Sequence, residues 1–212
     1  MARPRLFLFG AALSLIVVDS AAQAHEVGRW RVDLTLSVRT YDSFGVPADD
    51  LSTAQDEAAA TFREAGVEIT WVNCYPGGRN LLAGSPRCAE PLDSSELMLR
   101  IVSEACDETN RLVTMGFSWV SRQQTVAPHV ATVFADRVQR VAHAARANVV
   151  GVLALAIAHE LGHVLLASTA HAKAGLMQAV WSHSQLRRPR AELRFLDKEA
   201  LAMQTILRRR SR

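Results

Sequence analysis

The sequence lacks the features that mark repeat proteins, disordered proteins and nucleic-acid-binding proteins. It contains no internal repeat and no low-complexity linker, so we expect a single domain. Its formal net charge is only +3 and 49% of its 212 residues are hydrophobic, which is typical of a globular protein and argues against disorder. No aromatic residues interleave with the terminal arginines, so we read these as a solvated basic tail and expect no nucleic-acid partner: Arg208, Arg209, Arg210 and Arg212.

Long apolar runs are few. The first, Leu6 to Val18, follows Arg3 and Arg5 and precedes Ala22-Gln23-Ala24, which fits an A-x-A cleavage site. This is the layout of a secretory signal peptide, and the run is shorter than the roughly 20 residues that span a bilayer, although an uncleaved anchor is the alternative. We therefore expect a signal peptide at 1–24 and a mature, monomeric domain at 25–212, secreted or periplasmic, without a membrane span.

Cysteine is scarce as well, with three residues in the chain. Export makes disulfides possible, and Cys74 and Cys88 flank a loop rich in proline and glycine. We expect this pair to be bridged, which would be worth roughly 3 kcal/mol in the chain-entropy model. Cys106 is then left over as a free or buried thiol, and other pairings stay open.

Hydrophobic periodicity indicates an α+β fold. Alternating residues predict strands at 31–38, 67–72, 96–102, 114–120 and 129–134. Apolar spacings of three and four predict a helix that begins at Asp49 or Asp50 and ends at Gly66. Further helices are expected at 137–147, from about Asn148 to about Ala167, and at 191–209. The third of these four helices is apolar all round and should be buried beneath a mixed sheet, although a membrane span is the alternative.

The run AIAHELGHVLLASTAH, 156–171, contains polar residues that burial alone would disfavour. His159, Glu160 and His163 fit H-E-x-x-H, in which two histidines four apart on a helix point at one zinc ion. Glu160 lies near the same face, where it can take a proton from a zinc-bound water without binding the metal. A chance cluster satisfied by hydrogen bonds is the alternative.

Catalytic zinc usually has three protein ligands and an open position. His171 is the expected third ligand, because the chain can turn back at Ala167-Ser168-Thr169. The other candidates remain open, and they are His183, Glu192 and Glu199. Three histidines outside the cluster are read as surface or satisfied core residues: His25, His129 and His143.

The segment HELGHVLLASTAHAKAGLM resembles the active-site signature of metzincins, zinc peptidases with H-E-x-x-H-x-x-G-x-x-H and a later methionine turn. The resemblance implies a zincin/metzincin-like fold, with a mixed twisted sheet, a backing helix, a buried active-site helix and a small C-terminal part ending in a helix. It also implies that His159, His163 and His171 bind zinc, that Glu160 is the general base, and that Met177 is the Met-turn residue. Ordinary core packing is the alternative for Met177.

The chain departs from the metzincin pattern at two positions. Leu166 and Thr169 stand where the family has its glycine and third histidine, and the histidine arrives two residues later. The sequence is more similar to uncharacterised secreted bacterial proteins with H-E-I-G-H-L-L-L, a later histidine and a G-I-M turn. That similarity covers most of the mature chain.

These observations predict a secreted zinc-dependent endopeptidase with a peptide or protein substrate. We expect an extended substrate to pair with a sheet edge within 114–134 and the segment 172–183 to wall the adjoining pocket. Trp181 is either a pocket or a core residue. The alternative functions are a zinc hydrolase of a non-peptide amide and a metal-binding protein without proteolytic activity.

Overall fold

The protein is an α+β fold with one mixed five-stranded sheet. The computed structural model describes residues 34–74, 85–93, 96–103, 114–120, 129–188 and 192–210. The strands are ordered β2-β1-β3-β5-β4 across the sheet, and only β4 runs antiparallel to its neighbour β5. Their bounds are β1 (Leu34–Asp42), β2 (Val67–Cys74), β3 (Glu96–Val102), β4 (Gly116–Trp119) and β5 (Val130–Phe134).

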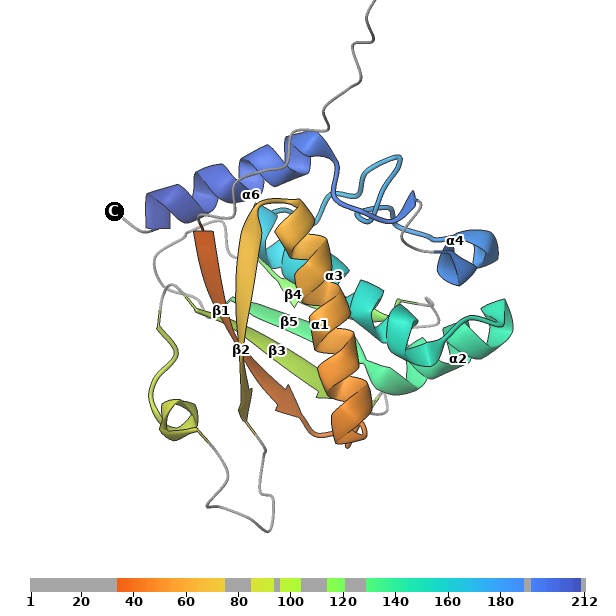
Figure 1. Cartoon of the computed structure of the whole chain (residues 1–212), viewed down its shortest axis with the longest axis horizontal. Coiled ribbons are helices and arrows are strands. Elements are labelled where there is room, and N and C mark those ends of the chain that lie inside the picture. Colours follow the sequence, from red (N-terminus) through yellow and green to blue (C-terminus); the bar gives the residue numbers. More distant parts are fainter. Residues whose placement is uncertain are drawn as a thin grey trace, which may run out of the picture.

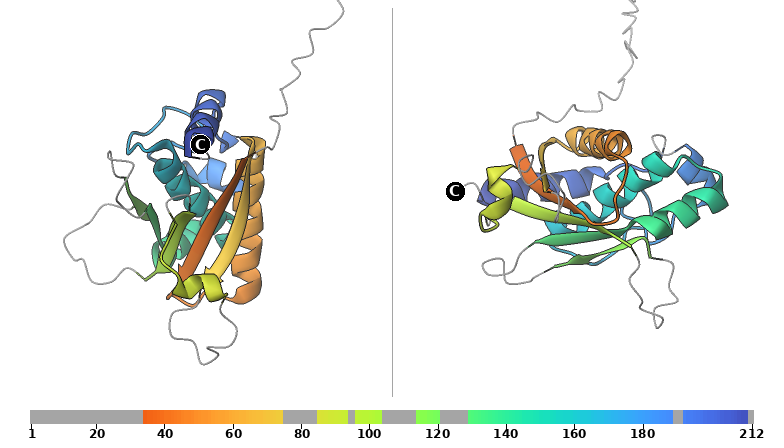
Figure 2. Two further views of the ribbon diagram at one scale, coloured as in Figure 1. Left: turned by 90° about the vertical axis from the view of Figure 1, so that its left-hand side faces the viewer. Right: turned by 90° about the horizontal axis from the view of Figure 1, so that it is seen from below.

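The long helices lie on one face of this sheet (Figures 1 and 2), with α1 and α3 packed side by side. In Figure 1, α6 crosses the top of the molecule, while α2 and α4 lie together at the right. The helices are α1 (Ala48–Glu64), α2 (Ala135–Ala145), α3 (Val149–Leu166), α4 (His183–Arg187) and α6 (Asp197–Arg210), with a 3-10 turn, η1 (Pro86–Ala89).

Alternation along the strands explains why one face of the sheet is dry. Leu97, Leu99 and Ile101 on β3 are fully buried, whereas Arg100 between them is exposed. The buried side chains meet α1 and α3, so the core lies between the sheet and these helices. Apolar residues removed from water in this way supply most of the stabilisation of such a layer.

Helix α3 is long and apolar enough to cross a membrane by length and composition, and no other helix of the described residues is. However, 78% of its 18-residue window is buried inside the protein. The prediction that this helix is buried is therefore confirmed. Its start is also as expected, because the side chain of Asn148 caps it and accepts a hydrogen bond from the Gly151 amide at 2.9 Å.

Two predicted helix starts are wrong. Helix α1 begins after Pro47 with no side-chain cap, and Asp49 and Asp50 lie in its first turn, where acidic groups still favour the helix dipole. The closing helix begins at Asp197 rather than near 191, because residues 193–196 are not helical and contact the loop that contains Leu176 instead. The Arg194 carbonyl there accepts a hydrogen bond from the Leu176 amide at 2.9 Å.

The expected disulfide between Cys74 and Cys88 is present and joins the end of β2 to η1. Three expectations fall outside the described residues: the signal peptide at 1–24, the state of Cys106, and the surroundings of His25.

Candidate metal centre

Three histidines from two segments meet at the C-terminal half of α3. His159 and His163 lie four residues apart on the helix, so their rings share a face. Helix α3 ends at Leu166, and the left-handed backbone of Ala167 (φ 48°) reverses the chain and returns His171 to the same place. One ring nitrogen of each histidine lies within 4.8 Å of the others. The described residues thus contain a three-histidine group that could hold a metal ion, with two members buried and His171 exposed.

Backbone carbonyls fix the hydrogen positions on the two buried rings. His159 Nδ1 lies 2.9 Å from the Leu176 carbonyl oxygen, and His163 Nδ1 lies 2.7 Å from that of Ser168. A carbonyl oxygen can only accept, so each Nδ1 carries its hydrogen and donates it. A neutral imidazole has one N–H, and each Nε2 therefore presents a lone pair.

These two lone pairs face each other, because the Nε2 atoms of His159 and His163 are 3.0 Å apart. A proton or a metal ion between them would relieve the repulsion. Protonation is disfavoured at neutral pH, since burial lowers the pKa of His159 to about 4 and also lowers that of His163. Nitrogens bound to one tetrahedral ion at about 2.0–2.1 Å lie roughly 3.3 Å apart, close to the observed spacing. The donor set therefore fits a metal ion.

Glu160 follows His159 on α3 and is only 7% exposed. Burial raises the pKa of this carboxyl to about 7, while a hydrogen bond from Ser118 acts in the opposite direction. Ser118 belongs to β4, and its Oγ lies 2.6 Å from Oε2 of Glu160. A buried carboxyl that titrates near neutrality beside a metal-fitting group is suited to accepting a proton from a bound water.

The loop after His171 forms the floor beneath α3. The Leu176 carbonyl accepts hydrogen bonds from both His159 Nδ1 and Trp181 Nε1, the latter at 3.0 Å. The Trp181 ring also meets the His159 ring edge-on, with 5.3 Å between centroids. Trp181 is 9% exposed and lines the cleft, so it serves both as packing and as a wall.

Met177 lies in this floor and is 1% exposed. It packs against α3 at Gly162, where an added Cβ would lie 2.8 Å from the methionine sulfur. The turn that presents it requires Gly175, whose φ of +80° disfavours other residues and where a Cβ would lie 2.7 Å from the Arg194 carbonyl oxygen. Met177 thus contacts the helix one residue before His163.

A cleft of about 630 Å³ opens above the three histidines, within the usual size of small-molecule and peptide sites. Strand β4 forms one wall of the cleft and α3 forms its base. Residues 178–181, in the loop after His171, form the other wall. Away from the histidines the lining is largely apolar and includes Met115, Val141, Ala156, Val180, Trp181 and Leu186. Part of the expected pocket wall, 172–183, is therefore where it was predicted.

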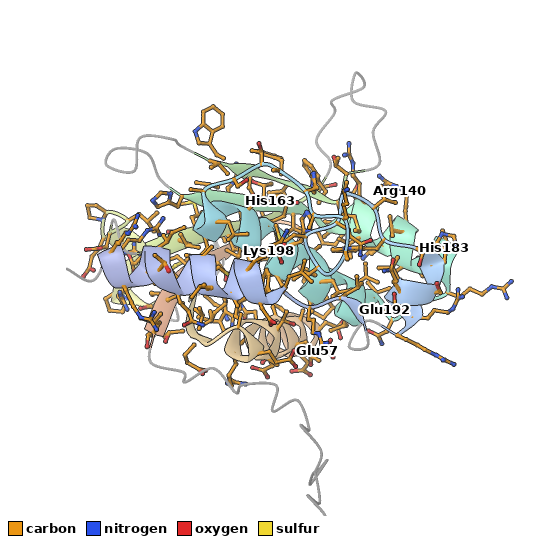
Figure 3. The ribbon with its side chains drawn as sticks, turned by 90° about the horizontal axis from the view of Figure 1, so that it is seen from above. Glu57, Arg140, His163, His183, Glu192 and Lys198 are labelled. Carbon is orange, nitrogen blue, oxygen red and sulfur yellow. A yellow bond between two sulfur atoms is a disulfide. The ribbon has the colours of Figure 1, made fainter. Side chains whose placement is uncertain are left out.

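The other candidate ligands do not join the three-histidine group. His183 lines the far part of the cleft, and Figure 3 shows it with Glu192 at the α4 end of the molecule, away from His163. Glu199 is buried but accepts a hydrogen bond from the Leu196 amide at 2.9 Å, at the start of α6. Of the histidines outside the cluster, His129 is buried beside β5 and His143 is exposed on α2.

Sequence reasoning missed Ser118, Gly116 and the two carbonyl acceptors of the histidines. Small residues at 116 and 118 alternate with Phe117 and Trp119, which was a usable sign that one face of this strand meets something closely. The carbonyl acceptors carry no side-chain signal at all. Finding them required the fold of the loop.

Among known proteins, no family model matches this chain, and no curated protein matches its sequence. What the structure establishes is a three-histidine group that could hold a metal ion, beside a buried glutamate, in a cleft with mostly apolar walls.

Proposed function

We propose that the protein is a zinc-dependent metallopeptidase of zincin/metzincin-like fold, with His159, His163 and His171 as metal ligands and Glu160 as general base. The observation that carries the proposal is the pair of Nε2 lone pairs 3.0 Å apart, in the same cleft as the buried Glu160. Such a pair needs a cation, and the neighbouring base gives that cation a use in hydrolysis.

Zinc suits this donor set because imidazole nitrogens are among its commonest ligands. The group offers three ligands from the described residues, which is the number that catalytic zinc takes while it keeps one position open. When bound, zinc would polarise a carbonyl and make water a better nucleophile at neutral pH. A purely structural site would be expected to fill all four positions with protein ligands.

Glu160 would take the proton of the attacking water and pass it to the leaving amine. A base is most effective when its pKa lies near the working pH, and burial brings the pKa of Glu160 to about 7. The hydrogen bonds from Nδ1 of His159 and His163 to backbone carbonyls would keep both rings in the tautomer that leaves Nε2 free for the metal.

The resemblance to metzincins supports the same proposal. The order of a strand, a helix and four further strands before α2 and α3 is similar to that of their N-terminal subdomain. The two-residue delay of the third histidine is accommodated, because the chain reverses at Ala167 and still returns His171 to the group. Met177 packs against α3 from the floor, which suits a Met-turn residue.

The substrate would be an extended peptide or protein segment. Strand β4 lies at the edge of the described sheet and forms a wall of the cleft, so a peptide could pair with it as an added strand. The apolar walls around Trp181 and Leu186 would accept an apolar side chain next to the scissile bond. We further propose that the enzyme is exported, as the signal-like N-terminus predicts, and that it is a monomer.

The test is cleavage of a peptide library by residues 25–212 with zinc supplied. We expect cleavage that a chelator abolishes and that zinc restores. Glu160→Gln should bind zinc but cleave far more slowly than the wild type, and Glu199→Gln is the matched control, since this buried glutamate lies outside the metal group. Zinc bound without cleavage of any peptide would redirect the proposal to a non-peptide amide or to a binding role. Activity of Glu160→Gln equal to that of the wild type would refute the mechanism.

A further inference from the structure

The Glu160 carboxyl is held from outside its own helix. Ser118 Oγ lies 2.6 Å from Oε2 of the Glu160 side chain and 2.7 Å from the backbone oxygen of the same residue. One hydroxyl on β4 therefore contacts two oxygens of one residue on α3. Among the described residues, Ser118 is the one side chain with a hydrogen bond to this carboxyl, and that bond is made to Oε2.

This arrangement anchors one carboxyl oxygen and leaves the other available. Glu160 and Gly116 both line the cleft, and Oε1 is the carboxyl oxygen that lies next to Gly116. The Ser118 hydroxyl has one hydrogen and two lone pairs, and it can rotate to donate or to accept. It can thus keep hold of Oε2 whether or not the carboxyl has taken up a proton.

Close approach of β4 to α3 makes the contact possible. Along β4, Gly116 and Ser118 face the helix, whereas Phe117 and Trp119 alternate with them and are 47% and 66% exposed. A Cβ at Gly116 would lie 2.7 Å from Cγ of Glu160 and 2.8 Å from Oε1. The glycine therefore makes room for the carboxyl that the serine binds.

The position of β4 is itself fixed on both sides. Ser118 pairs with Ala131 and Gly116 pairs with Val133 in the antiparallel ladder to β5. Just before β4, Arg137 of α2 donates hydrogen bonds to the backbone oxygen and the hydroxyl of Thr114, at 2.8 and 3.0 Å. A slip of β4 by one residue would replace Ser118 by a large aromatic residue at Glu160.

We propose that Ser118 is a positioning residue, which holds the Glu160 carboxyl by Oε2 and so directs Oε1 into the cleft. This role rests on the proposed function for its catalytic consequence, but its geometry stands without it. Ser118 does not touch substrate or metal in this role. It acts through Glu160, and its removal should free the carboxyl to take other rotamers.

The test compares Ser118→Ala, Ser118→Thr and the control Ser37→Ala in the zinc-loaded protein. Ser37 is a matched control because it also lies on a strand, β1, and its hydroxyl also contacts a buried glutamate, Glu96, at 3.4 Å. Neither Ser37 nor Glu96 lines the cleft. Ser118→Ala should lower kcat about 10- to 100-fold with little change in KM or zinc affinity, because misplacing a reacting group by about 1 Å has effects of this size. Ser118→Thr keeps the hydroxyl and should recover most of kcat, and Ser37→Ala should resemble the wild type.

Crystal structures of the same zinc-loaded proteins supply a readout that does not depend on activity. The Glu160 carboxyl should keep its place in the wild type and in Ser118→Thr, and leave it in Ser118→Ala. A carboxyl that stays in place in Ser118→Ala, or a threonine variant no better than alanine, would overturn the proposal. If the wild type cleaves no peptide, the proposed function fails by itself, and the position of the carboxyl in Ser118→Ala still decides the role of Ser118.

Discussion

Two buried glutamates, one on the central strand β3 and one on helix α3, have opposite electrostatic surroundings. Glu96 on β3 is 1% exposed, and Glu160 on α3 is 7% exposed. Burial alone raises the pKa of both carboxyls. Yet the pKa of Glu96 ends below its ordinary value, whereas that of Glu160 rises to about 7. The difference must come from what surrounds each carboxyl.

Glu96 sits among donors and positive charges. Arg39 Nη2 lies 2.5 Å from Oε2, Arg87 Nη2 lies 2.6 Å from Oε1, and the Asp93 amide donates to Oε2 at 3.1 Å. Arg39 is itself buried and also donates to the carbonyls of Glu90 and Pro91. These contacts outweigh the cost of burial and keep Glu96 charged. They also fasten the segment that carries η1 to the sheet.

Glu160 has a single hydroxyl where Glu96 has two guanidinium groups and an amide. Ser118 lowers the pKa of Glu160, but burial dominates and the net shift is upward. A carboxyl in these surroundings gains and loses a proton near neutral pH, and one with two arginines does not. The comparison separates a glutamate that fastens the fold from one that is available for chemistry.

The largest expected contrast is in activity. Glu160→Gln should lower kcat about 10²- to 10⁴-fold, the range in which general base catalysis contributes, while the protein stays folded and binds zinc. Glu96→Gln, assayed well below its melting temperature, should keep kcat close to the wild type. Steady-state rates on one cleaved peptide and thermal melts of both variants give the comparison. Equal loss of kcat in the two variants would erase the distinction between the glutamates.

Stability should show the reverse order. Glu96→Gln leaves Arg39 buried without its charge partner, and breaking a buried pair in this way costs about 3–5 kcal/mol. Arg39 keeps its hydrogen bonds to two backbone carbonyls in this variant, so we expect a cost at the lower end of that range. Urea unfolding of the metal-free proteins measures the free energy, with Glu160→Gln beside it. A Glu96→Gln variant as stable as the wild type would show that the ion pair stabilises the folded state no more than water stabilises the same charges in the unfolded chain.

Much of the active helix could be predicted from the sequence, because its signals are local. The four-residue spacing of His159 and His163 needs only helical periodicity, and Asn148 is an ordinary helix cap. The pairing of Cys74 with Cys88 follows from their positions around one loop. The helix start at Asp49 or Asp50 was wrong because a capping side chain is a preference, and here Pro47 fixes the entry instead.

The surroundings of both glutamates could not be predicted, because they depend on contacts between distant segments. Ser118 and Glu160 are 42 residues apart, and Arg39 and Glu96 are 57 apart. Each contact is set by strand register, with Ser118 opposite Ala131 and Ser37 opposite Glu96. In the sequence, Glu96 and Glu160 are both single acidic residues beside apolar ones. Only the fold shows which of them has positive partners.

The raised pKa of Glu160 predicts a pH effect on stability in the metal-free protein. Between the ordinary carboxyl pKa of 4.5 and about 7, the folded state holds a proton that the unfolded state has lost, so the contribution of Glu160 falls as pH rises. The lowered pKa of His159, about 4 against 6.5, acts in the opposite direction over much of this window. The two effects therefore oppose each other in the wild type, and the lowered pKa of His163 acts in the same direction as that of His159.

Glu160→Gln removes one of these effects and exposes the other. Its unfolding free energy relative to the wild type should therefore rise with pH between about 4.5 and 7, by up to about 3 kcal/mol, since one pKa unit corresponds to about 1.4 kcal/mol. Urea unfolding at intervals across this window, with chelator present, measures the difference. A difference between the two proteins that does not vary with pH would mean that the Glu160 carboxyl is not perturbed by burial.

The smallest effect is expected at the outer side of the Glu96 site. Arg87 pairs with Glu96 but its side chain is 49% exposed, whereas that of Arg39 is 3% exposed. An exposed pair is weakened by water and salt, so Arg87→Gln should cost at most about 1 kcal/mol, and less in high salt. Arg39→Gln should cost several times more with little dependence on salt, because it leaves Glu96 buried and charged without its closest partner. Unfolding both variants at low and high salt would show which arginine keeps Glu96 charged. If Arg87→Gln proved the more costly of the two, the role of Arg87 would be to hold η1, beside the Cys74–Cys88 disulfide, and not to balance the buried carboxyl.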